Sequence, residues 1–281
     1  MQKSQNNLNI DLLGKHYPVL DKGFVKVIDV MGNDISIVQA ARVSYNQGSK
    51  GLIKDTALIN FLMRHKHTSP FEMCEIKLHV KVPIFIARQW IRYRTANVNE
   101  ISGRYTQLPR DYYVPDINQV LSQGNTNKQK GGEILSLPKA ERFIKIVEEA
   151  SELAYSRYER ALEIGVSREQ ARMLLPTNFY TEFYWKIDLH NLFNFLQQRL
   201  SKDAQAEIRA YAETIGVIVE QWCPAAYRAF LEARVLGCNL TGVEDKIIRR
   251  RLQGASIEEA LYGQPLTSEQ SAKLMNMFGE I

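Results

Sequence analysis

The stretch EIKLHVKVP, residues 75–83, constrains the fold more than any other part of the sequence. Four apolar residues alternate with polar ones along it: Ile76, Leu78, Val80 and Val82. Because successive side chains of a β-strand point to opposite faces of a sheet, this pattern predicts a strand with one buried face. Residues 24–31, FVKVIDVM, also alternate, are rich in β-branched side chains and precede turn residues. They predict an earlier strand.

Helical periodicity describes most of the remaining chain. Apolar spacing and boundary residues predict helices at 34–42, 55–65, 84–94, 138–163, 189–200, 204–222 and 225–236, with more helix from residue 243 onward. The helix at 84–94 can follow the strand directly, because Pro83 is tolerated at a helix start. In the helix at 138–163 one face carries Phe143, Val147, Ala150 and Ala154.

Two shorter segments have their own local patterns. Ser167 and Gln170 have the spacing of a capping box for the helix that holds Arg172. Residues 124–132, GNTNKQKGG, are polar and glycine-rich, and we interpret them as a mobile surface loop rather than a linker between domains.

Length and composition exclude several classes of protein. With 281 residues, 45% of them apolar, the chain can bury a sizeable core as one large domain or two closely joined ones, and it fits neither a disordered chain nor a fibre. The formal net charge of +5 suits anionic ligands. A dedicated DNA-binding protein usually concentrates its basic residues in one stripe, whereas here they are spread along the chain. We interpret the densest run, RRR at 249–251, as a solvated helix face.

The cysteines and the apolar segments indicate a cellular location. Cys74, Cys223 and Cys238 are odd in number and lack paired spacing, so the sequence predicts neither a disulfide framework nor a zinc site. The N-terminal residues lack the apolar core of a signal peptide, and no segment approaches the roughly 20 apolar residues that span a bilayer. We expect a soluble cytoplasmic protein with no membrane partner.

Residues 88–105, RQWIRYRTANVNEISGRY, combine arginines with a single acidic residue, Glu100. The arginines are Arg88, Arg92, Arg94 and Arg104. The first part continues the predicted helix, and 95–103 should be a polar loop whose backbone amides are available to a ligand. A helix that leads into such a loop can present converging donors to a phosphate-bearing molecule.

Other candidate residues allow more than one interpretation. His65 and His67 lack a nearby carboxylate or cysteine with ligand spacing, so we predict no metal site. Arg172 and Arg199 lie in apolar surroundings, where a guanidinium needs an anionic or hydrogen-bonding partner. That partner is either a ligand or a structural ion pair. Generic RNA binding stays open as well, because arginines near Trp90 suit stacked bases.

The spacing of residues 92–104 resembles the signature of the flavin-dependent thymidylate synthase family. That signature reads Arg-His-Arg, two residues, Ser, one, Asn, two, Ser, one, Arg, and five of its seven fixed positions match here. The chain has, in order, Arg92, Tyr93, Arg94, Asn97, Asn99, Ser102 and Arg104. Neighbouring segments agree as well, namely HTSPFE, PIFIARQW, NEISGRY, RMLLPTNFYTEFYW and NFLQQRLSKDAQAEI. The resemblance covers about residues 24–230.

The resemblance implies a substrate, deoxyuridine monophosphate (dUMP), and a resident cofactor, FAD. The residues it assigns to the nucleotide are Gln89, Arg92, Glu100, Ser102, Gly103, Arg104, Arg172 and Arg199. Those at flavin positions or close to the flavin are Ser69, Arg92, Tyr93, Arg94, Glu100, Asp188, His190, Asn194 and His67.

The resemblance also implies a reaction. NADPH reduces the flavin, methylenetetrahydrofolate donates the carbon, and the reduced flavin delivers hydride to complete the methyl group on C5. Arg199 matches the arginine near N3 of the uracil, and a fixed cation there favours the N3-ionised pyrimidine, whose C5 is the better nucleophile. Family members are homotetramers whose sites combine several subunits, so we expect a homotetramer that binds a small nucleotide and no nucleic acid.

Several positions depart from the family pattern. Tyr93 replaces the signature histidine, Asn97 replaces its first serine, Gln198 stands where an aliphatic residue is expected, and Asp188 stands where asparagine is more usual. A phenol cannot offer the cation near neutral pH that imidazole can. Two other functions therefore stay open: a relative that methylates UMP in making a modified nucleoside, and an RNA-binding protein that keeps the fold.

The patterns and the resemblance together predict the architecture. We expect an α+β protein in which an antiparallel sheet packs against long helices. We expect one domain over residues 1–281, with a helical extension at 240–281 beyond the family resemblance.

Overall fold

A computed structural model describes residues 11–43, 49–124, 131–237 and 240–278. Contacts divide the chain into two compact units, Met1–Val235 and Leu236–Ile281. The boundary lies close to residue 240, where the sequence predicts the helical extension. Cys238 and most of the predicted loop at 124–132 lie outside the described residues.

The first unit is built on a five-stranded sheet in the order β1-β2-β3-β7-β4. The strands are β1 (His16–Val19), β2 (Gly23–Met31), β3 (Glu75–Pro83), β7 (Tyr180–Asp188) and β4 (Asn97–Glu100). Every neighbouring pair is antiparallel, which confirms the predicted sheet and both predicted strands.

The predicted alternation decides which face of the sheet is buried. In β3 the apolar residues are buried and the polar ones are partly exposed. β7 pairs with β3 along its whole length and buries Phe183, Trp185 and Ile187 on the same face. β7 is not predicted from the sequence, because its outward-facing Tyr184 and the aromatic residues at its start weaken the contrast between the two faces.

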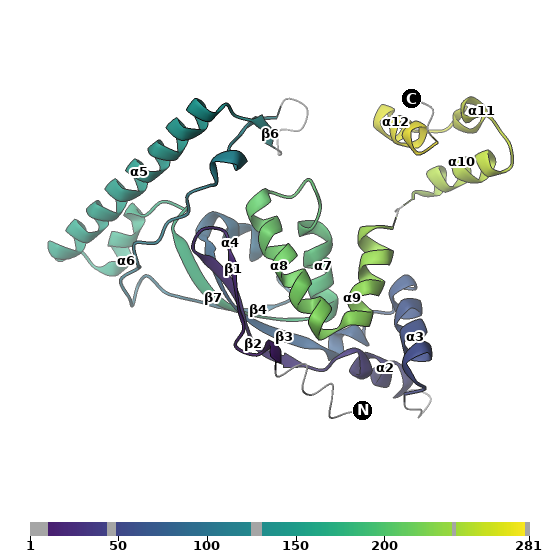
Figure 1. Cartoon of the computed structure of the whole chain (residues 1–281), viewed down its shortest axis with the longest axis horizontal. Helices are drawn as coiled ribbons and strands as arrows, with labels where there is room; N and C mark the ends of the chain where they lie inside the picture. Colours follow the sequence, from purple (N-terminus) through teal and green to yellow (C-terminus); the bar gives the residue numbers. More distant parts are fainter. Residues whose placement is uncertain (1–10, 44–48, 125–130, 238–239, 279–281) are drawn as a thin grey trace. The chain divides into compact units, whose positions relative to one another are not determined.

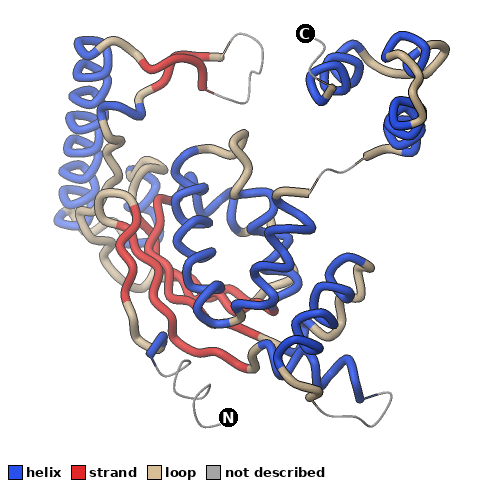
Figure 2. Tube along the Cα trace, turned by 45° about the vertical axis from the view of Figure 1, so that its right-hand side comes forward, coloured by secondary structure: helices blue, strands red, loops and turns tan. Residues whose placement is uncertain are grey.

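Helices cover the apolar face of the sheet (Figures 1 and 2). They are α4 (Ile84–Trp90), α7 (Leu189–Arg199), α8 (Ala206–Trp222) and α9 (Pro224–Phe230), with α2 (Asp34–Arg42) and α3 (Leu52–Arg64) beside them. At the centre Trp90 contacts Trp185, Phe195 and Tyr211, with ring centroids 4.9–5.6 Å apart. This packing fixes the end of α4 and the body of α7 against the sheet.

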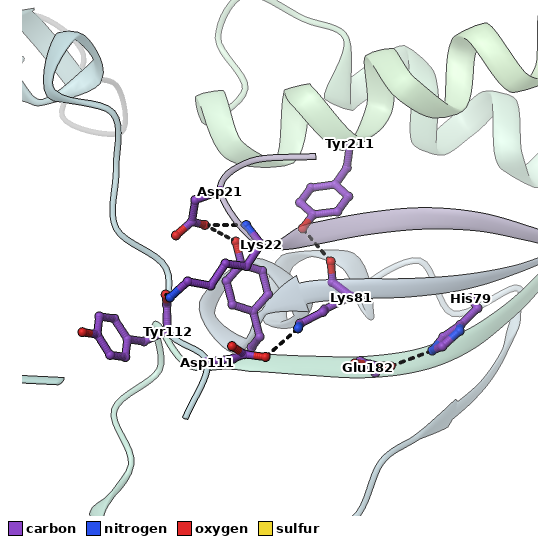
Figure 3. A network of polar contacts seen from close by, with 9 residues as sticks. Asp21, Lys22, His79, Lys81, Asp111, Tyr112, Glu182 and Tyr211 are labelled. Carbon is purple, nitrogen blue, oxygen red and sulfur yellow. Dashed lines mark hydrogen bonds and ion pairs between the residues drawn. The ribbon is translucent and has the colours of Figure 1, made fainter. Parts of the chain in front are cut away.

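Polar contacts anchor the chain that follows β4 to the sheet (Figure 3). Lys81 Nζ donates to Asp111 Oδ2 over 2.6 Å, and Lys22 Nζ donates to the Tyr112 carbonyl over 3.1 Å. From the helical side, the Tyr211 hydroxyl donates to the Lys81 carbonyl over 2.6 Å. Lys81 therefore joins the loop, the middle of the sheet and α8.

The long helix α5 (Leu137–Glu163) follows a small hairpin of β5 (Leu121–Gln123) and β6 (Gly131–Ile134). The first and last residues of the predicted 124–132 loop are described, and residues 131–132 belong to β6 rather than to a loop. Phe143 and Ala150 of the face that the sequence emphasised are exposed. The residues that α5 buries are Ala140, Ser151, Tyr155 and Tyr158.

Local predictions were wrong at two places. The helix predicted at 84–94 ends at Trp90, and the predicted loop at 95–103 contains β4. Ser167 makes no capping hydrogen bond through its side chain, and α6 (Arg168–Ala171) passes into the short 3₁₀ helix η4 (Arg172–Leu174). The predicted helix at 225–236 is confirmed, since α9 continues directly into a π-helical turn, η5 (Leu231–Val235).

The second unit holds α10 (Gly242–Leu252), α11 (Ile257–Leu261) and α12 (Ser268–Met277). Each helix begins with a capping box, at Thr241, Ser256 and Thr267. Arg249 and Arg250 are exposed as expected of a solvated face, while Arg251 is half-buried and donates to the Ala255 carbonyl over 2.8 Å. None of the helices in the described ranges is long and apolar enough to cross a membrane.

Candidate functional site

A polar pocket of about 420 Å³ lies between the chain that follows α4 and one side of α7. We call it the α7 pocket, and its lining residues are Arg92, Tyr93, Arg94, Thr95, Ile187, Asn191, Asn194, Gln197 and Gln198. The lining includes four predicted site residues: Arg92, Tyr93, Arg94 and Asn194. Thr95, Ile187, Asn191 and Gln197 are not among the residues predicted from the sequence.

The burial of Trp90 explains why the signature arginines leave the helix. Its indole is fully buried, and the Tyr93 amide donates to the Trp90 carbonyl over 3.1 Å, which closes a turn. Arg92 and Arg94 are exposed on either side of Tyr93. No ion pair joins either of them to another of the described side chains. Two guanidiniums are therefore presented at the pocket.

Tyr93 links this turn to the end of α7. Its hydroxyl donates to Gln198 Oε1 over 2.8 Å, and its ring packs edge-on against Phe195 with centroids 4.9 Å apart. Burial raises the pKa of Tyr93, although the charge of Arg199 opposes this shift. The phenol is neutral near pH 7, so it can act as the donor to Gln198.

Arg199, the last residue of α7, lies over the ring of Tyr93, with Cζ 5.3 Å from the ring centroid. Its Nε is buried and has no hydrogen-bond partner within the described ranges. A buried donor without a partner on a charged side chain is uncommon, and it indicates that a ligand or a small movement of the side chain completes its hydrogen bonding.

A chain of side-chain hydrogen bonds follows α7 from its start. Asp188 caps the helix by accepting from the Asn191 amide over 2.9 Å and from its Nδ2 over 2.7 Å. Asn194 Nδ2 donates to Asn191 Oδ1 over 3.5 Å, and Arg234 Nη1 donates to Asn194 Oδ1 over 3.1 Å. Burial, then the charge of Arg234, lowers the pKa of His190. This series of hydrogen bonds orients Asn194 in the α7 pocket.

Arg234 contacts Asn194 of the α7 pocket and is not among the residues predicted from the sequence. It is half-buried in η5, and burial lowers its pKa. In the sequence Arg234 is an ordinary basic residue of a predicted helix, and its partner Asn194 lies 40 positions earlier in the chain. No local pattern identifies such a pair.

A second group of predicted residues gathers around Glu169 of α6, and we call Arg104, Glu169 and Arg172 the arginine cluster. Arg104 Nε donates to Glu169 Oε2 over 3.0 Å, and Arg172 Nε donates to the Glu169 carbonyl over 3.3 Å. Gly103 lies against it, since a Cβ there would be 3.3 Å from Arg172 Cδ and 3.0 Å from Leu108 Cδ1. The sequence analysis did not identify Glu169.

The pairing of β4 with β7 positions the signature residues that precede Arg104. β4 pairs with β7, and the Ile101 amide donates to the Glu182 carbonyl over 2.9 Å. Glu100 accepts from the Thr181 hydroxyl over 2.5 Å, and Ser102 Oγ accepts from the Arg104 amide over 3.3 Å. Glu100 is therefore held at the sheet edge, and Ser102 lies in the turn that follows β4.

The remaining predicted residues lie elsewhere on the chain. His67 and Ser69 are exposed in the segment between α3 and β3, and the His67 ring lies 5.9 Å from Phe61. Gln89 Nε2 donates to Gln205 Oε1 over 2.6 Å, just before α8. Across the part of the chain that the structure describes, no three His, Cys, Asp or Glu side chains are grouped so that they could hold a metal ion.

The residues from 26 to 225 match the family model described as thymidylate synthase complementing protein. The match covers the α7 pocket residues and the arginine cluster. The chain belongs to the flavin-dependent thymidylate synthase family.

Relatives in this family agree with it over most of their length. The flavin-dependent thymidylate synthase of Wolbachia pipientis wMel is 50% identical over 255 residues, which is 90% of each chain. That of Ehrlichia ruminantium strain Gardel is 53% identical over 79% of this chain and 75% of its own. That of Rickettsia conorii is 45% identical over 96% of this chain and 95% of its own.

Two solved structures are also similar. They are those of a UMP/dUMP methylase, PolB, from Streptomyces cacaoi, bound with 5-Br dUMP and with 5-Br UMP. Their sequence identities are 29% and 30%, with TM-scores of 0.69 and 0.70. The aligned regions cover 75% and 78% of this chain and 96% and 98% of theirs. The comparison supports the α+β fold of this flavin-dependent thymidylate synthase relative.

Proposed function

We propose that this protein methylates C5 of dUMP to give dTMP, with FAD as its resident cofactor, methylenetetrahydrofolate as carbon donor and NADPH as reductant. Family membership at about half sequence identity supports the activity. The single observation that carries it is Arg199, a half-buried cation at the end of α7 whose buried Nε lacks a partner in the described chain.

The residues present fit a flavin and an anionic nucleotide. The α7 pocket combines the guanidiniums of Arg92 and Arg94, which form no ion pair with the described side chains, with the amide of Asn194, and these groups suit a large, phosphate-bearing molecule. We propose that Arg92, Tyr93, Arg94, Asp188, His190 and Asn194 hold the flavin, with Ser69, His67 and Glu100 contributing to the same site. FAD, when bound, supplies hydride to the carbon that becomes the methyl group.

The arginine cluster suits the nucleotide. The ion pair of Arg104 with Glu169 is more than half exposed on both sides, so a phosphate can replace the carboxylate at little cost. We propose that Arg104 and Arg172 bind the phosphate and that Gln89, Ser102 and Gly103 surround the rest of the nucleotide. Arg199 stabilises negative charge at N3 of the uracil, which raises electron density at C5.

We further propose a homotetramer that shares its active sites between subunits. Phe143, Ile146 and Leu153 of α5 are 43%, 54% and 58% exposed. Their spacing gives an apolar stripe on a side of the helix other than the one that packs inward. A second copy of the chain would bury this stripe, and residues of several copies could then complete the flavin site. A cytoplasmic location stays a prediction.

A second candidate function is methylation of UMP. The solved UMP/dUMP methylase with bound 5-Br UMP supports it. The deciding contacts are those around the ribose 2′ position. RNA binding by the same arginines is the third possibility, and FAD that copurifies with the protein would argue against it.

The test is release of tritium from 5-tritiated dUMP and UMP, assayed in parallel with FAD, NADPH and methylenetetrahydrofolate. Release from dUMP supports the proposed function, and the ratio between the two substrates selects between it and the UMP-methylating alternative. No release from either by protein that contains bound FAD would refute both activities.

A further inference from the structure

The side chains of Tyr93 and Gln198, two positions that depart from the family pattern, are hydrogen-bonded to each other. The Tyr93 hydroxyl donates to Gln198 Oε1 over 2.8 Å. The residues are 105 positions apart in the sequence, and Gln198 directly precedes Arg199 on α7. A bond between these two side chains therefore lies next to the cation that the proposed chemistry depends on.

Arg199 rests on the face of the same tyrosine ring. Its Cζ lies 5.3 Å from the ring centroid, within the range of a cation–π interaction. Three contacts hold Tyr93. Its hydroxyl donates to Gln198, its ring packs against Phe195 with centroids 4.9 Å apart, and its backbone amide donates to the Trp90 carbonyl over 3.1 Å.

We propose that Tyr93, tied down by Gln198, positions the guanidinium of Arg199 for the uracil. The inference rests on the proposed function. The ring attracts the cation, and of the five N–H groups of the guanidinium those that are not directed at Tyr93 stay available to the pyrimidine. Fixing an arginine side chain in one rotamer costs conformational entropy. Because the Tyr93 ring already holds Arg199 before the substrate binds, less of this entropy is lost during the reaction.

The order of effects among variants follows from this arrangement. Tyr93→Leu removes the platform, and we expect kcat for tritium release from dUMP to fall about tenfold, which corresponds to about 1.4 kcal/mol. Tyr93→Phe keeps the ring and loses only the hydrogen bond to Gln198, which we call the tether, so we expect kcat to fall about threefold. Gln198→Leu removes the acceptor of the same hydrogen bond, and its kcat should match that of Tyr93→Phe.

The double variant Tyr93→Phe with Gln198→Leu isolates the hydrogen bond. If the bond acts as a unit, the double variant is no slower than either single one. If the two falls in kcat multiply, the residues act independently and the tether is refuted. Tyr262→Phe is the matched control, because this tyrosine is 84% exposed in the second unit and should leave kcat unchanged.

Three readouts separate positioning from a general loss of structure. Bound FAD per subunit and the melting temperature should equal those of the wild type in Tyr93→Phe, and KM for dUMP should change less than kcat. Full kcat in Tyr93→Leu, or a fall in kcat of Tyr93→Phe that goes with loss of FAD, would overturn the inference.

A binding measurement needs no turnover. The N3 proton of 5-fluoro-dUMP is acidic, and its loss changes the ultraviolet absorbance. We expect wild-type protein to lower the N3 pKa of the bound analogue and Tyr93→Leu to reverse most of that shift. An equal shift in both proteins would overturn the inference. Failure of the wild type to release tritium from either nucleotide would instead refute the proposed function, so the two failures are distinguishable.

Discussion

Replacing Arg199 by alanine should separate catalysis from folding. The guanidinium is proposed to stabilise charge that develops on the uracil. Loss of one such preorganised group typically costs 10²–10³-fold in kcat, or about 3–4 kcal/mol. We expect Arg199→Ala to lower tritium release from dUMP by about that factor, with FAD still bound, because the pocket that is proposed to hold the ring is lined by other residues.

The same substitution should leave stability nearly unchanged. It removes a cation–π contact with Tyr93 worth about 0.5–2 kcal/mol, which destabilises the variant. It also removes the buried Nε, which has no hydrogen-bond partner among the described residues and so costs the wild type about 1–3 kcal/mol. These two terms oppose each other, so we expect the free energy of unfolding to change by less than about 1.5 kcal/mol.

The assay compares Arg199→Ala with Arg249→Ala, an exposed arginine paired with Asp245 in the second unit. Denaturant unfolding measures the stability of each variant, and tritium release measures kcat. Absorbance near 450 nm measures bound flavin, which is on the order of one per subunit if the site is intact. The reasoning fails if Arg199→Ala loses its flavin, if it is destabilised by more than about 3 kcal/mol, or if its kcat stays within tenfold of the wild type.

Three further predictions concern other parts of the molecule. Glu169→Gln frees Arg104 from an exposed ion pair and should lower KM for dUMP by at most about fivefold, and a raised KM in steady-state kinetics would contradict this. Ile146→Arg places a charge in the exposed stripe of α5 and should reduce the oligomer to smaller species in light scattering while the subunit stays folded; an unchanged mass would contradict it. Folding lowers the pKa of His190 below 6.5, so the contribution of its neutral imidazole to the free energy of unfolding is present above that pH and is lost as the pH falls from 6.5 towards the folded pKa. The free energy of unfolding of His190→Gln should therefore depend less on pH between 7 and 5 than that of the wild type, as measured by denaturant unfolding.

The sequence predicted the strands whose faces differ in polarity and missed those whose faces do not. In β3 a regular alternation gives a clear period of two, and the predicted bounds equal the observed ones. In β4 all four residues are exposed, so no alternation exists to be read, and only pairing with β7 makes it a strand. The end of α4 was missed for a related reason, because helical periodicity continues past Trp90 although the chain turns there.

The candidate site divides in the same way. The resemblance assigned Arg92, Tyr93 and Arg94 by their spacing, and the structure brings all three to one pocket. Glu169 and Arg234 carry no comparable pattern. Their partners are 65 and 40 positions away, and an acidic or basic residue on a helix is usually a solvated one.

The separation of these groups on one chain bears on how the site works. The α7 pocket depends on one side of α7 and the chain after α4, whereas the arginine cluster depends on α6 and the residues after β4. In a shared arrangement, the subunit that binds the nucleotide phosphate presents its Arg199 to a different active site. If sites are shared as proposed, mixing inactive Arg199→Ala subunits with inactive Arg104→Ala subunits should restore part of the activity, since some sites would then receive both intact arginines. Subunits that each complete their own site would give no such recovery, and that outcome would refute sharing between these two arginines.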